Sequence, residues 1–431
     1  MEAGLFIFVA LLGLILIGMP IAFALAASAT LTMYFFETTT FLFQAKSIVT
    51  AVNSYPLLAV PLFILAGDLM YTGGLSRRLT AAIYSFVGSI KASLSYVTVL
   101  AATFFGAISG SSPATVAAIG TVMIPEMDRQ KYPSDYSAAL IASAGVIGVM
   151  IPPSIPYVMY GVASEESVAT LFMSGILPGL LFAAGYMLLA RLIYGKRKLD
   201  TPLKPFRWDE CRATFKDAFW ALLAPVIVLG GIYGGIVSPT EAAAISVVYA
   251  LVVGGFIYRE LTFKSFRDTL GKSVGTIGMI LALVAFASTF GRILTIEQVP
   301  QQAGELAAGI SSNPIIILLL INLALLVVGM FFETIAAIVI LTPVLLPIAK
   351  SFGIDPIHFG TIMTINLAIG FCSPPFGVNL FVASAISKQS IEQISKALIP
   401  YFAVMIFLLV LITYLPAIAL TVPRLLMGYA G

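Results

Sequence analysis

Four breaks in otherwise apolar sequence carry the residues of this chain that could do chemistry. The first two are residues 110–113 (GSSP) and 148–156 (GVMIPPSIP), and the other two are 333–334 (ET) and 372–377 (CSPPFG). Carbonyls freed by Pro and Gly, together with Ser and Thr hydroxyls, are hard oxygen ligands that suit a small cation such as Na⁺. The N–H groups freed where a half-helix begins suit an anion. The breaks therefore predict a site for an ion and an anionic ligand.

The second pair of breaks is an altered copy of the first pair. At one fixed offset along the chain, prolines of the first half align with prolines of the second: Pro125 with Pro347, Pro152 and Pro153 with Pro374 and Pro375, and Pro178 with Pro400. In a membrane chain, matching Gly/Pro interruptions in two halves point to the binding site of a transporter. The alternative is that these residues merely allow kinks and tight helix packing. Four breaks paired by one duplication favour the binding site.

The composition is that of a membrane protein. The chain of 431 residues is 60% hydrophobic and 10% charged, and segments such as 218–258 and 396–423 are long enough to cross a hydrocarbon core. No cleavable signal peptide is evident at the first residues. The single His358 cannot form a metal cluster, and no Walker A motif indicates ATP binding.

The placement of charges predicts the orientation in the membrane. Lys and Arg gather in the connections 77–91, 129–131, 196–216, 259–272 and 388–396. The connections 164–170 and 297–313 contain Glu but no Lys or Arg. The positive-inside rule places the first set in the cytoplasm and the second set outside. The N-terminus is then expected in the cytoplasm and the C-terminus on the outer, periplasmic side.

This assignment is satisfied by nine spans and two segments that enter and leave by the same face. The spans are expected near 3–36, 55–72, 137–163, 170–194, 218–236, 239–258, 273–295, 357–387 and 397–423. The two re-entrant segments are 93–127 and 313–350, and 41–54 is expected at the outer interface. Because 218–236 belongs to neither copy, the second copy is inverted. The expected fold is an all-α polytopic membrane protein with an inverted-topology repeat, two re-entrant helical hairpins and broken helices.

The basic segment in the middle divides the chain. Residues 1–195 are expected to form the first repeat, with a scaffold arm at 1–92, a hairpin and broken helix at 93–165 and a helix at 170–195. Residues 196–238 hold a cytoplasmic linker and a connecting span. Residues 239–431 form the second repeat, with an arm at 239–295, a hairpin at 313–350, a broken helix at 357–387 and a last span at 396–423.

Several strings of residues, in this order and spacing, resemble a known family. They include PLFILAGDLM (61–70), GAISGSSPATVAAIG (106–120), SPTEAAAISVVYAL (238–251) and PPFGVNLFVASAI (374–386). Together they resemble the large membrane subunit of the tripartite ATP-independent periplasmic (TRAP) transporters, and the likeness covers nearly the whole chain. The resemblance implies an elevator-type transporter in the bacterial inner membrane, with the hairpins and broken helices as the moving part.

The resemblance also implies a function and partners. It implies sodium-coupled import of an organic acid, such as a C4-dicarboxylate, a sialic acid or a similar carboxylate, with Na⁺ as the coupling ion and no other cofactor. The implied partners are a small four-helix membrane subunit, expected here as a separate chain, and a periplasmic substrate-binding protein. The chain works within the lipid bilayer, and no nucleic acid is expected.

Ionisable residues inside apolar segments raise the free energy of the chain when they face lipid, so they should face protein or water. Arg292 could grip the carboxylate of a substrate, because a guanidinium stays charged and binds in pairs of hydrogen bonds. Its alternatives are a salt bridge to Asp68 or Glu297, or snorkelling to the interface. Glu333, at the second hairpin tip, could serve a sodium site or a gate, and its alternative is a helix cap. Glu241 is expected to be an N-terminal cap.

The expected site combines these residues with the breaks. The predicted substrate-binding residues are Arg292, Ser112, Ser154 and Glu333. The predicted Na⁺ ligands are Ser109, Gly110, Ser111, Ser112, Gly148, Pro152, Gly329, Glu333, Thr334, Gly370, Cys372, Ser373 and Gly377. No catalytic residue is expected.

Two other classes of protein stay open. One is a stand-alone, ion-coupled carboxylate symporter that needs no binding protein. The other is a membrane-embedded enzyme, but the sequence lacks a G-x-S-G nucleophile with a partner His, paired Asp residues on adjacent helices and an H-E-x-x-H zinc motif. The chain is therefore expected not to be an enzyme.

Overall fold

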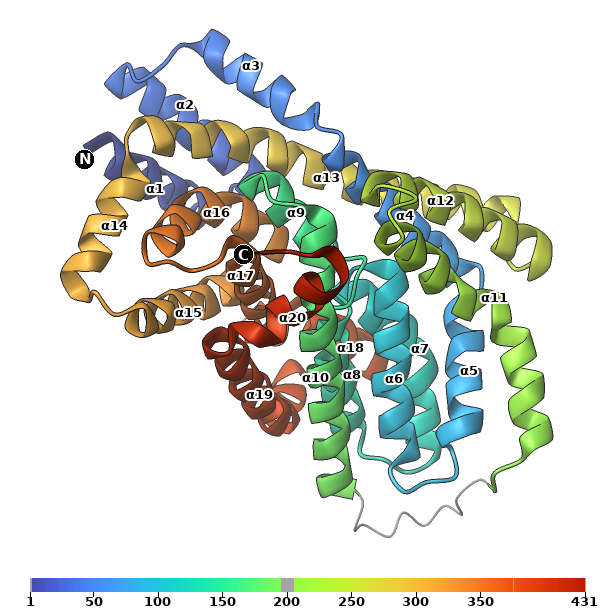
Figure 1. The fold of residues 1–431 in the computed structure, drawn as a ribbon. Coiled ribbons are helices and arrows are strands. Elements are labelled where there is room, and N and C mark those ends of the chain that lie inside the picture. Colours follow the sequence, from blue (N-terminus) through green and yellow to red (C-terminus); the bar gives the residue numbers. More distant parts are fainter. Residues whose placement is uncertain (1, 195–204, 375, 431) are drawn as a thin grey trace.

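The computed structural model describes residues 2–194, 205–374 and 376–430, and the described chain is helical throughout (Figure 1). In the first half the helices are α1 (Glu2–Leu16), α2 (Ile21–Phe36), α3 (Phe41–Val52), η1 (Pro56–Leu58), α4 (Ala59–Thr72), α5 (Leu75–Val87), α6 (Ser93–Ser109), α7 (Ser112–Arg129), α8 (Ser134–Ile147), α9 (Ile155–Ser164) and α10 (Val168–Tyr194). In the second half they are α11 (Trp208–Tyr233), α12 (Pro239–Val252), η2 (Val253–Ile257), α13 (Phe263–Ile296), α14 (Val299–Ile310), α15 (Pro314–Phe331), α16 (Thr334–Ser351), α17 (Pro356–Gly370), α18 (Val378–Ser387), α19 (Ile391–Tyr414) and α20 (Pro416–Met427).

The duplication seen in the sequence reappears in the helix boundaries. The offset that carries Pro125 onto Pro347 also carries α6 onto 315–331 and α7 onto 334–351, which match the bounds of α15 and α16 closely. The same shift carries α8 onto α17, α9 onto α18 and α10 onto α19. The two predicted hairpins and the two predicted broken helices are therefore confirmed as helical elements.

Local sequence explains why the helices break where they do. Ser111 and Ser154 have extended backbones, and each side chain accepts a hydrogen bond from an N–H group in the first turn of the next helix. Pro113 and Pro156 follow in that first turn, where a missing N–H costs nothing. Glu333 caps α16 in the equivalent place. Each second half-helix thus begins at a residue suited to start one.

The single span predicted at 3–36 is wrong. The segment folds into two antiparallel helices, because Phe6 near the start of α1 packs on Phe35 and Phe36 at the end of α2, with ring centroids 5.7 and 5.3 Å apart. Gly18 adopts a left-handed backbone with φ of 89°, and Pro20 precedes α2. Neither residue continues a helix, so the apolar run turns back instead of crossing once.

This hairpin also gives α11 a counterpart. Under the same shift, α1 overlaps the second half of α11, and α2 overlaps α12 and η2. The contacts agree with this correspondence. The contact of α2 with α13 has its equivalent in that of α12 with α4, and the contact of α1 with α14 has its equivalent in that of α11 with α5. The span at 218–236 therefore belongs to the second copy, contrary to the sequence-based prediction. Helices α1 and α2 have 15 and 16 residues and are shorter than the helices counted below as able to cross a membrane. If both nevertheless cross, the positive-inside rule predicts an external N-terminus in place of the cytoplasmic one.

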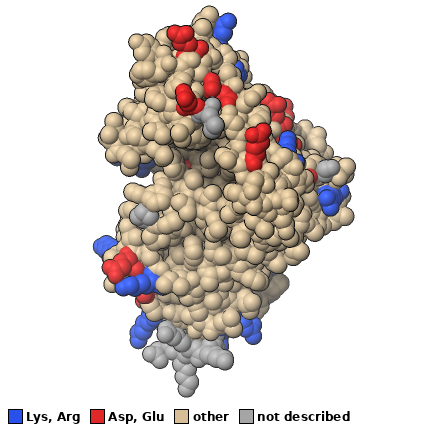
Figure 2. Space-filling view, turned by 90° about the vertical axis from the view of Figure 1, so that its left-hand side faces the viewer, with Lys and Arg blue, Asp and Glu red and all other residues tan. Residues whose placement is uncertain are grey.

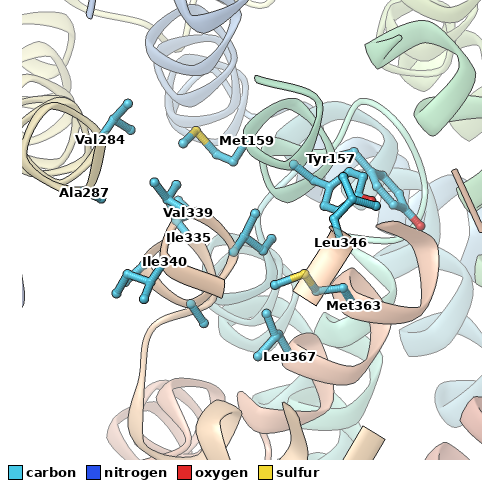
Figure 3. Close-up of a cluster of buried hydrophobic side chains, with 14 of the residues drawn as sticks. Tyr157, Met159, Val284, Ala287, Ile335, Val339, Ile340, Leu346, Met363 and Leu367 are labelled. Atoms are coloured by element: carbon cyan, nitrogen blue, oxygen red, sulfur yellow. The ribbon is translucent and has the colours of Figure 1, made fainter. Parts of the chain in front are cut away.

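The two copies pack into each other rather than side by side. Helix α16 of the second hairpin packs on α9 of the first copy, and α7 of the first hairpin packs on α18 of the second copy. Figure 3 shows one of these contacts: buried side chains of α16, among them Ile335 and Val339, meet Met159 of α9 and Val284 of α13. The hairpins are thus held by elements from both halves of the chain.

The helices meet the requirements of a membrane protein. Seven described helices are long and apolar enough to cross a membrane, or eight if the bent pair 41–52 and 56–72 is counted as one span. Figure 2 shows acidic side chains with some basic ones on the upper part of one face, side chains of both signs toward its lower end, and a hollow in its upper half. The centre of this face is largely uncharged, as expected of a surface in contact with lipid.

Candidate functional site

A cavity of about 850 Å³ lies where the hairpin tips and the helix breaks meet. Its wall contains the starts of four half-helices, namely Pro113 and Ala114 of α7, Ile155 and Pro156 of α9, Ile335 and Ala336 of α16, and Val378 of α18. The rest of the wall comes from the arms: residues 20–23 before and in α2, 64–68 in α4, and 276–283 in α13. The cavity therefore joins both repeats and both arms.

The charge balance in the cavity is unusual for an anion site. Asp68 and Glu333 line it, and its described lining residues include no Lys or Arg. Positive potential must instead come from the helix starts, because each aligned helix carries a partial positive charge at its N-terminus. Four such ends line this one space, and at one of them, the start of α16, the Glu333 carboxylate already accepts the first N–H groups.

The first hairpin tip is tied closely to the first helix break. Gly110 has φ of 61°, and a Cβ atom there would lie 2.6 Å from the carbonyl oxygen of Pro153. The N–H group of Ile155 donates to the carbonyl oxygen of Gly110 at 3.2 Å. Only glycine allows both the backbone conformation and this approach. The tip and the start of α9 therefore form one rigid unit.

Hydroxyl groups crowd the same tip. The Ser109 and Thr115 hydroxyl oxygens lie 3.1 Å apart, and the Thr115 hydroxyl donates to the Ser111 carbonyl oxygen at 2.8 Å. Ser109, Gly110, Ser111 and Ser112 all line the cavity. The structure therefore brings four of the predicted ligands together with hydroxyl and carbonyl oxygens at close spacing.

Ser112 is held by a residue that the sequence reasoning missed. Its hydroxyl donates to Oδ1 of Asn379 at 3.1 Å, and Nδ2 of Asn379 lies 2.8 Å from the same hydroxyl and 2.9 Å from the Ala142 carbonyl oxygen. Both side chains are fully buried. Asn379 thus links the first hairpin to the second copy's half-helix. The sequence signal that could have indicated this contact is the amide side chain of Asn379 within the apolar run GVNLF (377–381).

At the second tip, the capping alternative for Glu333 is the one that the geometry shows. Its carboxylate accepts from the N–H groups of Ile335 at 2.8 Å and Ala336 at 3.2 Å, while the side chain is exposed to the cavity. Thr334 donates to the Leu367 carbonyl oxygen at 3.3 Å. A negatively charged side chain therefore occupies a helix start where an external anion could bind.

The remaining predicted ligands lie behind the cavity wall. Ser154 is fully buried and donates to the Val149 carbonyl oxygen at 2.6 Å, and Ser373 donates to the Ile369 carbonyl oxygen at 3.2 Å. The predicted residues that the structure does not place in the wall are Gly148, Pro152, Ser154, Gly329, Thr334, Gly370, Cys372, Ser373 and Gly377. Pro375 lies outside the described residues.

Close backbone contact explains the glycines of the second break. A Cβ atom on Gly370 would overlap the backbone of Gly329, whose carbonyl oxygen is its nearest neighbour. Helices α15 and α17 therefore meet backbone to backbone at this point, which only glycine permits. The pair stays a predicted part of the second sodium site.

Arg292 lies away from the cavity. Its side chain is exposed on α13, and the guanidinium carbon is 5.9 Å from the centroid of the Phe43 ring. The cavity wall on this helix ends at Leu283, about 13 Å earlier along the axis. Asp68, one proposed ion-pair partner, instead accepts a hydrogen bond from Ser273 at 2.6 Å. The structure does not bring Arg292 to the other predicted substrate-binding residues.

Comparison with known proteins identifies the family. Residues 8–418 match the family model described as the DctM component of tripartite ATP-independent periplasmic transporters. The chain belongs to this family. The resemblance noted from its motifs is therefore confirmed, and the family is one of transporter permeases.

Relatives agree with this assignment, and a solved structure shares the fold. The chain is 46% identical over 404 residues to an isethionate TRAP transporter permease of Oleidesulfovibrio alaskensis, covering 94% of this chain and 64% of that protein. It is 38% identical to a C4-dicarboxylate TRAP transporter large permease of Vibrio cholerae, covering 98% of each. The fold matches the YdaH transporter of Alcanivorax borkumensis with a TM-score of 0.67 at 14% identity, over 89% of each chain.

Proposed function

We propose that this protein imports a small organic anion in symport with Na⁺. The observation that carries the proposal is the cavity of about 850 Å³ into which four half-helices from two inverted copies begin. Its volume is that of a small-molecule site. Its position at the paired breaks is where transporters with inverted repeats bind substrate and coupling ions.

Sodium coupling is supported by the charges of the cavity. Asp68 and Glu333 would both repel an anion that entered, and no basic side chain of the described wall offsets them. A bound cation would offset this repulsion, so anion and cation would stabilise each other. We place the first Na⁺ between residues 109–112 and 148–154, and the second between 329–334 and 370–377.

The relatives indicate the class of substrate. The proteins named above carry isethionate or C4-dicarboxylate in their names, and these molecules share a small size and a terminal sulfonate or carboxylate group. We propose a substrate of this kind, an organic acid whose anionic end faces the half-helix starts. The partial positive charge of these helix starts would attract such a group, although their first N–H groups already bond to Ser111, Ser154 and Glu333.

The packing of each copy's hairpin on the other copy's broken helix supports an elevator movement. The hairpins and broken helices bind one another across the copies, through α7 with α18 and α9 with α16, so they can move as one body against the arms. Inverted copies give such a body two related positions of similar energy. We propose a small membrane subunit that holds the arms and a periplasmic binding protein that delivers the substrate.

Uptake into proteoliposomes tests the proposal. The chain is reconstituted with its small subunit, and binding protein with a labelled acid is added outside, with a Na⁺ or a K⁺ gradient. We expect uptake with Na⁺ and at least a tenfold loss with K⁺. Undiminished uptake in K⁺ would refute sodium coupling. Uptake that needs neither partner would favour a stand-alone symporter.

A matched pair of variants tests the role of the cavity carboxylate. Glu333 and Glu241 are both glutamates that accept N–H groups at a helix start, but only Glu333 lines the cavity. Glu333→Gln keeps an oxygen for the cap and removes the charge, so half-maximal uptake should need several-fold more Na⁺. Glu241→Gln should leave the sodium dependence unchanged. Equal behaviour of the two variants would contradict the assignment.

A further inference from the structure

A second hollow lies on the outside of the molecule, far from the paired breaks in sequence. It is a groove of about 760 Å³ along the first half of α11, closed on one side by Phe86 of α5. The residues that line it are Phe86, Trp208, Cys211, Arg212, Phe215, Lys216, Phe219 and Trp220. The groove therefore combines large aromatic side chains with two cations.

The aromatic side chains leave an apolar surface uncovered. Trp208 is 66% exposed, Phe215 is 48% exposed and Phe86 is 44% exposed. Phe86 packs edge-on against Trp208 and Phe215, with ring centroids 6.5 and 6.4 Å apart, which fixes the wall of the groove. Because α11 is one of the helices long and apolar enough to cross a membrane, an exposed apolar surface of this kind is expected to face lipid.

The two cations have no acidic partner among the described residues. Arg212 and Lys216 are four residues apart, so they lie on one face of α11, and both side chains are exposed. Asp217, which follows Lys216, pairs with Arg78 of α5 at 3.3 Å. The groove thus presents two unneutralised positive charges beside its apolar wall.

The groove extends from the start of α11 toward the apolar half of this helix. Trp208 and Arg212 lie near the start of the helix, next to the basic segment that the positive-inside rule places in the cytoplasm. Trp220 lies about 18 Å deeper along the same axis. Arg212 and Lys216 alternate with aromatic side chains over this length, and beyond Lys216 the lining residues of α11 are Phe219 and Trp220. Cations at the level of an anionic leaflet, with an apolar wall beyond them, match a phospholipid with an anionic headgroup.

We propose that this groove binds an anionic phospholipid of the cytoplasmic leaflet. The phosphate of the headgroup lies between Arg212 and Lys216, and an acyl chain runs along Phe215, Phe219 and Trp220. Charge complementarity selects the headgroup, and the aromatic wall takes up the chain. The site is separate from the transport cavity, because the two share no lining residue.

The chain offers its own reporter, since its two tryptophans, Trp208 and Trp220, both line the groove. The full chain in neutral detergent micelles is titrated with phospholipids that carry bromine halfway along one acyl chain. Bromine quenches tryptophan fluorescence only at short range. Brominated phosphatidylglycerol is compared with brominated phosphatidylcholine, which has the same chains and no net charge.

We expect phosphatidylglycerol to reach half-maximal quenching at a mole fraction at least fivefold lower than phosphatidylcholine, since each cation near an anionic headgroup contributes about a fivefold preference. Arg212→Gln with Lys216→Gln should bring the two lipids to equal potency. The matched control is Lys264→Gln with Arg267→Gln, which removes two exposed cations of α13 outside the groove and should keep the preference.

Three results would overturn the proposal. Equal quenching by the two lipids in the unmodified chain would show an apolar surface with no preference for an anionic headgroup. A preference that survives in the Arg212 and Lys216 variant would place the lipid elsewhere. Quenching that disappears when the small membrane subunit is added would show that a protein helix, and not a lipid, fills the groove.

Discussion

The link between Ser112 and Asn379 offers the sharpest test of how the two copies are joined. Asn379 makes hydrogen bonds with the Ser112 hydroxyl and with the Ala142 carbonyl oxygen, and it is buried where no water can replace them. Asn379→Leu keeps a similar volume and removes every one of these bonds. Ser112→Ala removes only the bonds between Ser112 and Asn379 and leaves the bond from Asn379 to Ala142, which also joins the two copies.

The expected magnitudes follow from the number of bonds. An interhelical hydrogen bond in a membrane contributes about 0.6 kcal/mol on average and at most about 1.7 kcal/mol. Asn379→Leu loses three bonds and should lower the free energy of unfolding by about 2 kcal/mol. Ser112→Ala should cost about 1 kcal/mol. Because the two residues share bonds, the double variant should fall short of the sum by about 1 kcal/mol.

The assay is reversible unfolding in mixed detergent micelles of the two single variants and the double variant. Ser28→Ala is the control, because this buried hydroxyl bonds only within its own helix, to the Leu25 carbonyl oxygen at 3.1 Å. In the double variant of Ser28→Ala and Asn379→Leu, the two losses of unfolding free energy should add. Additivity in the Ser112 pair as well would show that the two copies are not joined through this contact.

Three further predictions concern the tip, the orientation and the arm. Gly110→Ala forces a side chain into the first break and should lower uptake at least tenfold, whereas Gly18→Ala, which shares a positive φ but has open space around it, should keep most of it; similar losses would contradict the tight contact. If α1 and α2 both cross the membrane, a cysteine in place of Glu2 should react with an impermeant maleimide added outside intact cells, whereas one in place of Ser134 should react only after permeabilisation; a Glu2 cysteine that reacts only after permeabilisation would support the cytoplasmic N-terminus predicted from the sequence. Arg292→Ala should leave ligand affinity in the cavity within about twofold, because the residue is exposed outside it, and calorimetric titration that shows a tenfold loss would return Arg292 to the site.

Much of this protein could be predicted because its information is local. Hydrophobic length indicates most of the spans, and Gly, Pro and N-capping residues mark the breaks, while the orientation from basic connections stays a prediction. The offset between the two copies was visible in prolines such as Pro125 and Pro347, and it predicts the bounds of the hairpin helices closely. Each of these signals depends only on neighbours along the chain or on a comparison of the chain with itself.

Other features depend on residues that are distant in sequence. The apolar run 3–36 is long enough for one span, and only the packing of Phe6 on Phe35 shows that it turns back. Arg292 was expected near the substrate because its charge lies in an apolar segment, but the rotation of α13 points it outward. Asn379 lies 267 residues from Ser112, so no local pattern could pair them. Composition determined that polar groups inside the membrane needed partners, and the tertiary structure decided which ones, because hydrogen bonds depend on three-dimensional proximity.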